Sequence, residues 1–313
     1  ATIDKYGQWP FKRSVYANMI ADLYHRNAGL VVWNVLMPEA DRQGGDAALA
    51  DTLNDYPVIL MNMPSQADKN TPRKPGSAVI GAEFIDTIIN YPGIIANIPE
   101  LENAASGIGI SNTMEEIDGV NRRLPLFVGA NGNLYPSVPL EVLRVMSNDS
   151  TFQVKLNEYG VEKMRIPKFG PISTDTYGRI WIDWSQQSQN YSVTNLPTDL
   201  KGAIVLVGPT AAGISNPVPT SIGAVYPNQA QAAVIATMFN GVNIQRPDYA
   251  DGAEMLTIVA AGLLLLFLTR YVYVGLASVV VLCVGAIVGS QYVFSHYLWL
   301  FDITTFKIGR AHV

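Results

Sequence analysis

Residues 254–269 read EMLTIVAAGLLLLFLT, and residues 275–294 read GLASVVVLCVGAIVGSQYVF. These two stretches decide how the chain is organised, because between Met255 and Phe301 only Arg270 carries a permanent charge. A helix needs about 20 apolar residues to cross the roughly 30 Å hydrocarbon core of a bilayer. The run is long enough for two crossings and the start of a third, so the sequence predicts a membrane protein.

The apolar run predicts membrane helices within residues 251–306, at about 253–271 and 273–294, with a third that begins near 297 and is cut. An Arg at the bilayer centre costs roughly 2.5 to 3.5 kcal/mol, so Arg270 is expected among the lipid headgroups. The opposite turn contains no Lys or Arg, and the positive-inside rule therefore places Arg270 in the cytoplasm. Residues 1–250 are then expected outside the cytoplasm, on a multi-pass protein of a bacterial inner membrane.

Both ends of the chain are interpreted as truncated. Residues 308–313 match the in-frame translation of a common sequencing adapter, and we treat them as an artefact. The domain at 1–250 is interpreted as incomplete at its N-terminus, because no signal peptide or leading membrane helix is present to explain its export.

Composition excludes several classes of function. The net charge is −5 and the basic residues are dispersed, which argues against nucleic acid as a partner. Cys283, the only cysteine, lies in the second apolar stretch, so no disulfide or thiol chemistry is expected in residues 1–250. His25 is the only histidine there, which disfavours a zinc site and a Ser-His-Asp triad. We therefore assign no catalytic residue, no metal ligand and no cofactor.

The N-terminal part of the chain alternates between helical and strand patterns. We expect a helix at 12–26, a buried strand at 29–35, a helix at 46–53 and a strand at 58–63, which indicates α/β layers with parallel strands. Farther along, the patterns predict an extended segment at 94–99, a loop at 70–76, and strands at 108–110, 126–128, 134–135, 162–166, 180–184 and 203–207, of which 203–207 is the strongest. The Asn131-Gly132-Asn133 turn predicts a hairpin, and helices are expected at 139–146, capped near Ser137, and at 228–239. The predicted fold class is an α/β domain with a mixed sheet, followed by α-helical membrane segments.

Two segments resemble binding loops. Gly208-Pro209-Thr210-Ala211-Ala212-Gly213 follows a strand as a phosphate-binding loop would, but the Lys and Ser or Thr of a Walker motif are missing, so a structural turn is favoured. Glu39, Asp41 and Asp46 could hold a hard cation, yet they lack the ligand order of an EF-hand. We favour Asp46 as a helix N-cap.

The ligand-binding candidates are five polar or aromatic residues. Arg122 and Arg123 follow an Asp-Gly turn at Asp118 and could bind a carboxylate or phosphate, although an internal bridge from one Arg to Asp118 is the favoured alternative. Trp9 and Arg13 could stack on a ligand, or pack as a lid over the core.

An ordered set of motifs resembles the second class of CHASE-type sensors (cyclases and histidine kinases associated sensory extracellular domain). The motifs are Gly7-Gln8-Trp9-Pro10-Phe11-Lys12-Arg13, Met37-Pro38-Glu39-Ala40-Asp41 with Asp46 and Leu49, Asp118-Gly119-Val120-Asn121-Arg122-Arg123, Tyr135-Pro136-Ser137 with Leu140-Glu141, and Ile204-Val205-Leu206-Val207-Gly208 with Thr210-Ala211. Lys12 and Tyr226-Pro227-Asn228 depart from common family patterns. The resemblance implies a further strand ahead of the Trp-Pro motif, and it offers no catalytic residues.

The resemblance implies an extracytoplasmic sensory input region that couples a stimulus to a cytoplasmic output domain. The favoured output is an adenylate or guanylate cyclase, and otherwise a histidine kinase, a Ser/Thr kinase or a diguanylate cyclase. This fragment itself is then no enzyme. Its expected partners are the lipid bilayer, a small-molecule or protein stimulus, and a second copy in a homodimer. The alternative is a membrane-anchored extracytoplasmic hydrolase or solute-binding protein.

Overall fold

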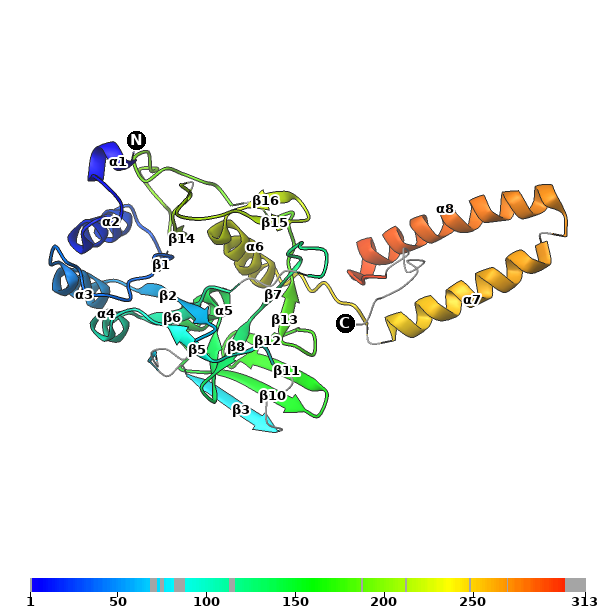
Figure 1. Ribbon diagram of the computed structural model, residues 1–313, viewed down its shortest axis with the longest axis horizontal. Coiled ribbons are helices and arrows are strands. Elements are labelled where there is room, and N and C mark those ends of the chain that lie inside the picture. Colours follow the sequence, from blue (N-terminus) through cyan, green and yellow to red (C-terminus); the bar gives the residue numbers. More distant parts are fainter. Residues whose placement is uncertain are drawn as a thin grey trace. The chain divides into compact units, whose positions relative to one another are not determined.

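The computed structural model describes residues 2–301 apart from 68–71, 74–75, 82–87, 113–115, 187, 212, 248 and 269. It divides into two compact units, Ala1–Val242 and Asn243–Val313. We describe each unit by itself (Figure 1).

The first unit is built on a parallel sheet. Its strands run in the order β14 (Ile204–Val207), β1 (Leu30–Trp33), β2 (Val58–Ser65) and β6 (Gly107–Ile110), with Val31 opposite both Val205 and Val58. The short β5 (Gly93–Ile95) pairs antiparallel with the far end of β2. β1 and β6 are buried along their whole length, as expected for strands covered on both faces.

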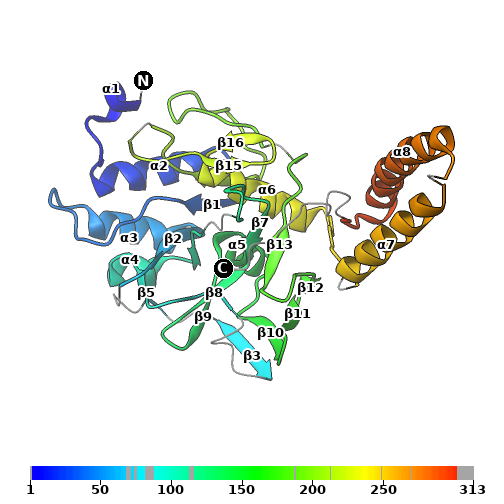
Figure 2. The same ribbon diagram turned by 45° about the vertical axis from the view of Figure 1, so that its right-hand side comes forward.

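Helices cover both faces of this sheet (Figures 1 and 2). On one face lie α2 (Arg13–His25), α3 (Asp46–Asp55) and α4 (Pro99–Ala104), whose apolar side chains pack on Val31, Trp33, Val58 and Leu60. On the other face lie α5 (Val138–Met146) and α6 (Pro227–Phe239), which contribute Val138, Val142 and Ile235 to a cluster with Leu30, Val32 and Ile59. The predicted α/β layering is confirmed.

A second sheet packs against the outer side of α5 and α6. Its order is β12 (Gly170–Ile172), β11 (Gly160–Ile166), β10 (Phe152–Asn157) and β3 (Ser77–Gly81). β10 and β11 are antiparallel, whereas β3 runs parallel to β10. Phe152, Val154 and Met164 of this sheet share a buried cluster with Leu143 of α5 and Val234 of α6. Hence α5 and α6 lie between two sheets.

The remaining elements are short. β4 (Asn90–Tyr91), β8 (Phe127–Ala130) and β9 (Asn133–Pro136) form a small sheet, β7 (Arg123–Pro125) pairs with β13 (Arg179–Trp181), β15 (Val218–Thr220) pairs with β16 (Gly223–Val225), and α1 (Thr2–Tyr6) begins the described chain. The hairpin predicted around residues 131–133 is confirmed as β8 and β9.

Helix α5 shows how local sequence positions a buried element. Ser137 Oγ accepts a hydrogen bond from the Leu140 backbone N–H at 3.5 Å and is the predicted N-cap. Glycine lets β6 approach this helix closely, because a Cβ on Gly109 would lie 2.5 Å from Val138 Cα. Glu141 Oε1 accepts from the Ile108 N–H at 3.1 Å and from Arg144 Nη2 at 2.6 Å, which fastens α5 to the strand.

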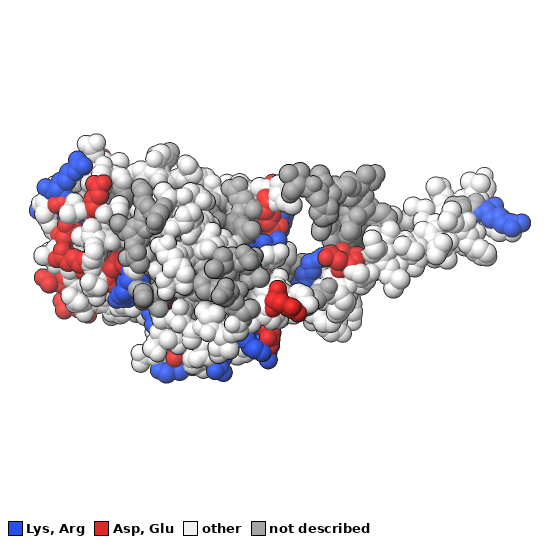
Figure 3. Space-filling view, turned by 60° about the horizontal axis from the view of Figure 1, so that its bottom comes forward, with Lys and Arg blue, Asp and Glu red and all other residues white. Residues whose placement is uncertain are grey.

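The second unit is a pair of apolar helices, α7 (Ala250–Leu268) and α8 (Val272–Tyr297). They contain 19 and 26 residues, and at about 1.5 Å per residue each can cross roughly 30 Å of hydrocarbon. Figure 3 shows white, uncharged surface along this unit, with charge at its two ends. The two membrane helices that the sequence predicts are therefore present as helices long and apolar enough to span a bilayer.

Some expectations need correction or lie outside the described residues. The N-cap of α3 is Gly45 rather than Asp46, whose carboxylate instead accepts the Asp41 N–H at 2.7 Å. The strand predicted at 162–166 is confirmed within β11, whereas the strand predicted at 180–184 is present only at 180–181, as the end of β13. Residues 298–301 are not helical, and the rest of the predicted third crossing and the adapter segment lie outside the described residues, as does most of the 70–76 loop.

Candidate functional site

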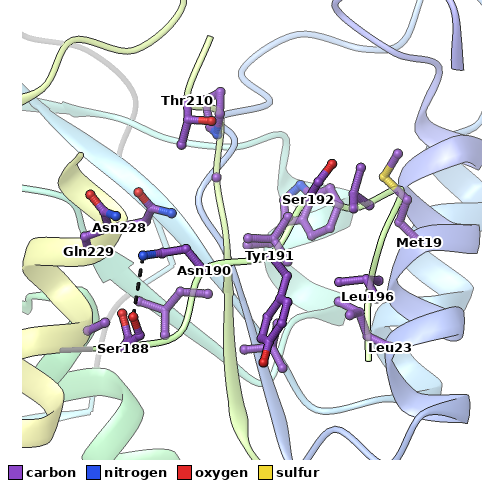
Figure 4. Close-up of a pocket in the computed structure, with 18 of the residues that line it drawn as sticks. Met19, Leu23, Ser188, Asn190, Tyr191, Ser192, Leu196, Thr210, Asn228 and Gln229 are labelled. Atoms are coloured by element: carbon purple, nitrogen blue, oxygen red, sulfur yellow. Dashed lines mark hydrogen bonds between the residues drawn. The ribbon is translucent and has the colours of Figure 1, made fainter. Parts of the chain in front are cut away.

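A groove runs along β14 between α2 and α6 and encloses about 1230 Å³ (Figure 4). All four residues of β14 are partly exposed, although Ile, Val and Leu make up the whole strand. The strand predicted most strongly from the sequence is thus the least covered of the parallel strands. β14 is the last strand on its side of the sheet, and its side chains are partly exposed where they line the groove.

The free edge of β14 offers backbone hydrogen-bonding groups. The Asn34 N–H donates to Val207 O at 2.8 Å, so the odd-numbered residues of β14 bond to β1. Because backbone groups of successive strand residues alternate in direction, Ile204 and Leu206 direct theirs to the other side. Within the described part of the chain no strand pairs with that side. An extended segment laid there could continue the sheet by strand addition.

The groove walls are apolar on both sides of β14. Figure 4 shows Met19 and Leu23 of α2 on one side and the start of α6, with Asn228 and Gln229, on the other. Farther along α6, Ile235 and Phe239 also line the groove. A polar segment at 188–192 borders it, and within this segment Asn190 Nδ2 donates to Ser188 O at 3.5 Å. A segment bound along β14 would therefore need apolar side chains on both faces.

The carboxyl end of β14 is polar and lacks positive charge. Gly208 and Thr210 line the groove here, next to the N-terminus of α6, which is where open α/β sheets commonly bind ligands. Asn228 Oδ1 is buried and has no hydrogen-bond partner among the described residues. Asn34 Nδ2 donates to Gln231 Oε1 at 2.8 Å just behind it. This end offers uncharged hydrogen-bonding groups, which agrees with the preference for a turn over a phosphate-binding loop at 208–213.

Trp9 is the sequence candidate that borders the groove. Its ring meets Phe11 edge-on, with centroids 5.4 Å apart, and lies 6.1 Å from the Tyr16 ring. These contacts place Trp9 on the core beneath α2, as the lid interpretation expects. Ligand stacking by Trp9 stays a prediction.

Arg13 is held by the loop that precedes α3. Its backbone N–H donates to Asp41 Oδ2 at 2.8 Å, and its Nη2 donates to Glu39 O at 3.1 Å. Arg13 Nε lies 3.4 Å from Asp46 Oδ1, an ion pair that is not aligned as a hydrogen bond. These contacts use the same three acidic residues that the sequence singled out as a possible cation site.

Asp118, Arg122 and Arg123 do come together, within what we call the Asp118 cluster. Its members are Glu116, Asp118, Arg122, Arg123, Asp175 and Arg179. Arg122 holds both carboxylate oxygens of Asp118, at 2.7 and 2.9 Å. This hydrogen bonding lowers the pKa of Asp118 to about 2. The internal bridge favoured from the sequence is present.

The second arginine of the cluster is also paired. Arg123 Nε donates to Glu116 Oε1 at 2.8 Å, its Nη1 donates to Asp175 Oδ2 at 3.3 Å, and its guanidinium lies 4.8 Å from the Trp181 ring centre. The sequence analysis missed Glu116 and Asp175 as partners, because nothing local marks them. An anionic ligand would have to displace these carboxylates. Trp9, beside the groove, and Arg13, bound by the loop before α3, are not members of this cluster.

Comparison with known proteins gives one family. The profile of the CHASE2 domain matches residues 1–267. No match to the chain was found among curated proteins or among solved structures.

Proposed function

Because the chain belongs to the CHASE2 family, whose domain is an extracellular sensory domain of signalling receptors, we propose that it is the input region of a bacterial transmembrane receptor. The matched domain is sensory rather than catalytic. The observation that carries the proposal is the match itself, together with the two apolar helices that follow the α/β unit.

In this proposal α7 and α8 each span the bacterial inner membrane once. The α/β unit lies in the periplasm or outside the cell, and Arg270, between the helices, lies in the cytoplasm. Its support is the family match, since the CHASE2 domain is an extracellular domain. The count of basic residues does not set the orientation, because Arg270 on one side of the bilayer is matched by Arg246 on the other. The lipid bilayer is then a direct partner of the chain.

The proposed output is a cytoplasmic enzyme joined through the membrane helices. An adenylate or guanylate cyclase is our first choice, and a histidine kinase, a Ser/Thr kinase or a diguanylate cyclase the next. A stimulus can drive such an enzyme only if it binds two states of the receptor with different affinity. We further propose that the receptor acts as a homodimer, which light scattering on the detergent-solubilised protein would test.

For the stimulus, the groove along β14 is the best-suited surface. It combines apolar walls, an open strand edge and an uncharged polar end. These features fit an extended apolar segment or a neutral molecule with an apolar body, whereas the Asp118 cluster has its arginines already paired.

Protease added to intact spheroplasts tests the proposed placement. We expect the α/β unit to be digested while a fragment containing α7 and α8 survives. A domain that stays intact until the cells are lysed would overturn the proposal. Reading the intact gene beyond Phe306 tests the output, since a stop codon directly after a third helix would leave no room for an enzyme.

The groove also favours the alternative, a membrane-anchored solute-binding protein. A thermal-shift panel of small solutes, run on the chain in detergent, separates the two. Stabilisation by a common nutrient, without any signalling domain in the gene, would favour solute capture. An extracytoplasmic hydrolase has no such support, because the groove lining contains no histidine, cysteine or paired carboxylates among its described residues.

A further inference from the structure

The linker before α7 contacts the chain just after α8. The Gln245 N–H donates to Leu298 O at 3.0 Å, and the Leu300 N–H donates to Gln245 O at 2.8 Å. Gln245 and Trp299 are parallel bridge partners. The chain that leaves α8 therefore runs beside the chain that enters α7.

Arg246 adds charge to this backbone junction. Its Nη2 donates to Asp251 Oδ1 at 2.7 Å and to Glu254 Oε2 at 2.8 Å, both on the first turns of α7. Its Nη1 also lies 3.5 Å from Leu300 O. The Glu254 side chain is only 7% exposed, so this ion pair stabilises a largely buried carboxylate. One guanidinium thus holds α7 and the segment after α8 together.

Two further features indicate that the junction is held in place. Leu298, the C-cap of α8, has φ 55°, a left-handed conformation that is unfavourable for a residue with a Cβ. The turn at Leu298 directs the chain that follows α8 back toward the linker at residues 243–246. The Trp299 ring then meets the Tyr249 ring edge-on, with centroids 6.4 Å apart.

We propose that these residues form a clasp that makes α7 and the segment after α8 move as one unit with the linker, and that Arg246 is its positioning residue. The clasp comprises Gln245, Arg246, Asp251, Glu254, Trp299 and Leu300. The inference rests on the proposed function, because the linker is where a sensory domain would pull on the membrane helices. A displacement of residues 243–246 would then move the start of α7 and the segment after α8 together.

Disulfide trapping in membranes tests the clasp. With Cys283→Ala as background, Gln245→Cys and Trp299→Cys should cross-link rapidly under mild oxidation, because bridge partners lie within disulfide reach. Adding Arg246→Gln should slow cross-linking about tenfold, the loss expected for charge-assisted hydrogen bonds, and Arg246→Lys should restore part of the rate. Arg270→Gln, at the other end of the helical pair, is the matched control and should change nothing.

Hydrogen exchange of the protein without introduced cysteines gives a second measurement. The Gln245 and Leu300 amides should be protected, and Arg246→Gln should reduce their protection about tenfold while Arg270→Gln does not. Equal cross-linking rates and equal amide protection in Arg246→Gln and Arg270→Gln would overturn the proposed clasp. Neither measurement needs a stimulus or an output enzyme. A failure of the clasp can therefore be distinguished from a failure of the proposed function, which the protease experiment in spheroplasts tests.

Discussion

The Asp118 carboxylate shows how one ion pair changes the chemistry of a surface residue. Arg122 holds both of its oxygens, and the Val120 N–H also donates to it at 3.1 Å. These hydrogen bonds favour the charged form, which is why the pKa falls from 3.8 to about 2. A lowered pKa means that the carboxylate stabilises the native loop above its unfolded pKa.

We predict that this stabilisation is present above about pH 4 and is lost as the pH falls toward 2, through the native pKa of Asp118. A carboxyl-detected NMR titration measures that pKa directly. Arg122→Ala should return it to near 3.8, whereas Lys155→Ala, which unpairs a different carboxylate, should leave it unchanged. An unshifted pKa in Arg122→Ala would show that the bridge does not hold in solution.

Glu141 is the acidic residue whose loss should cost most stability. It is 3% exposed and accepts bonds from Ile108 and Arg144. Glu141→Ala removes the carboxylate partner of Arg144, whose side chain is 14% exposed and keeps only the Asp149 carbonyl, and it leaves the Ile108 N–H unpaired. We therefore expect a loss of about 3–5 kcal/mol in the free energy of unfolding. Denaturant titration measures it. Glu162→Ala, which breaks the exposed pair with Lys155, should cost less than about 1 kcal/mol.

At the scale of elements, β14 differs from the other parallel strands in what covers it. β1 has neighbours on both sides and is fully buried, whereas β14 has a neighbour on one side. Apolar side chains on α2 and α6 extend past it, which creates the groove. Its apolar lining predicts affinity for hydrophobic molecules.

We predict that a hydrophobic fluorescent dye binds in this groove and that Ala232→Trp, on the α6 wall, reduces its binding severalfold by filling the space. Ala48→Trp places the same side chain on an exposed part of α3 and serves as the control. Dye fluorescence in a titration gives the comparison. Equal loss in both variants, or loss in neither, would place the dye elsewhere.

At the scale of the whole molecule, the chain combines an α/β unit with a helical pair that has almost no charge between its ends. A helix pair of this kind is stable in hydrocarbon, where its backbone groups are bonded internally. In the proposed topology the charged residues at its two ends lie on opposite sides of the bilayer, because each helix spans it once, with α7 ending at Leu268 and α8 beginning at Val272.

This arrangement predicts how single cysteines react in intact cells. In the Cys283→Ala background, Ser295→Cys should react with a membrane-impermeant maleimide added outside, whereas Arg270→Cys should react only after the cells are opened. Native Cys283, in the middle of α8, should react slowly in both cases because a charged, membrane-impermeant reagent does not enter hydrocarbon. The reverse labelling pattern would show that the protein has the opposite orientation in the membrane to the one proposed.

Local patterns were sufficient for the membrane helices, the hairpin of β8 and β9, the Ser137 cap and the parallel strands, because each depends on residues a few positions apart. They were insufficient for β10 and β3, and they placed the α3 cap one residue late, at Asp46 instead of Gly45. The five candidate residues were identified by type alone. The structure places three of them in one ion-pair cluster, Trp9 beside the groove and Arg13 in the loop before α3.

The sequence by itself determined that this protein has two apolar helices long enough to cross a bilayer and an α/β domain of the CHASE type, since hydropathy and strand periodicity are properties of contiguous residues. Only the tertiary structure decided that β14 is an edge strand beside a groove, and that Arg123 pairs with Asp175, 52 positions away. Strand order and ion-pair partners depend on which distant segments are brought together when the core is buried, and no local pattern contains that information.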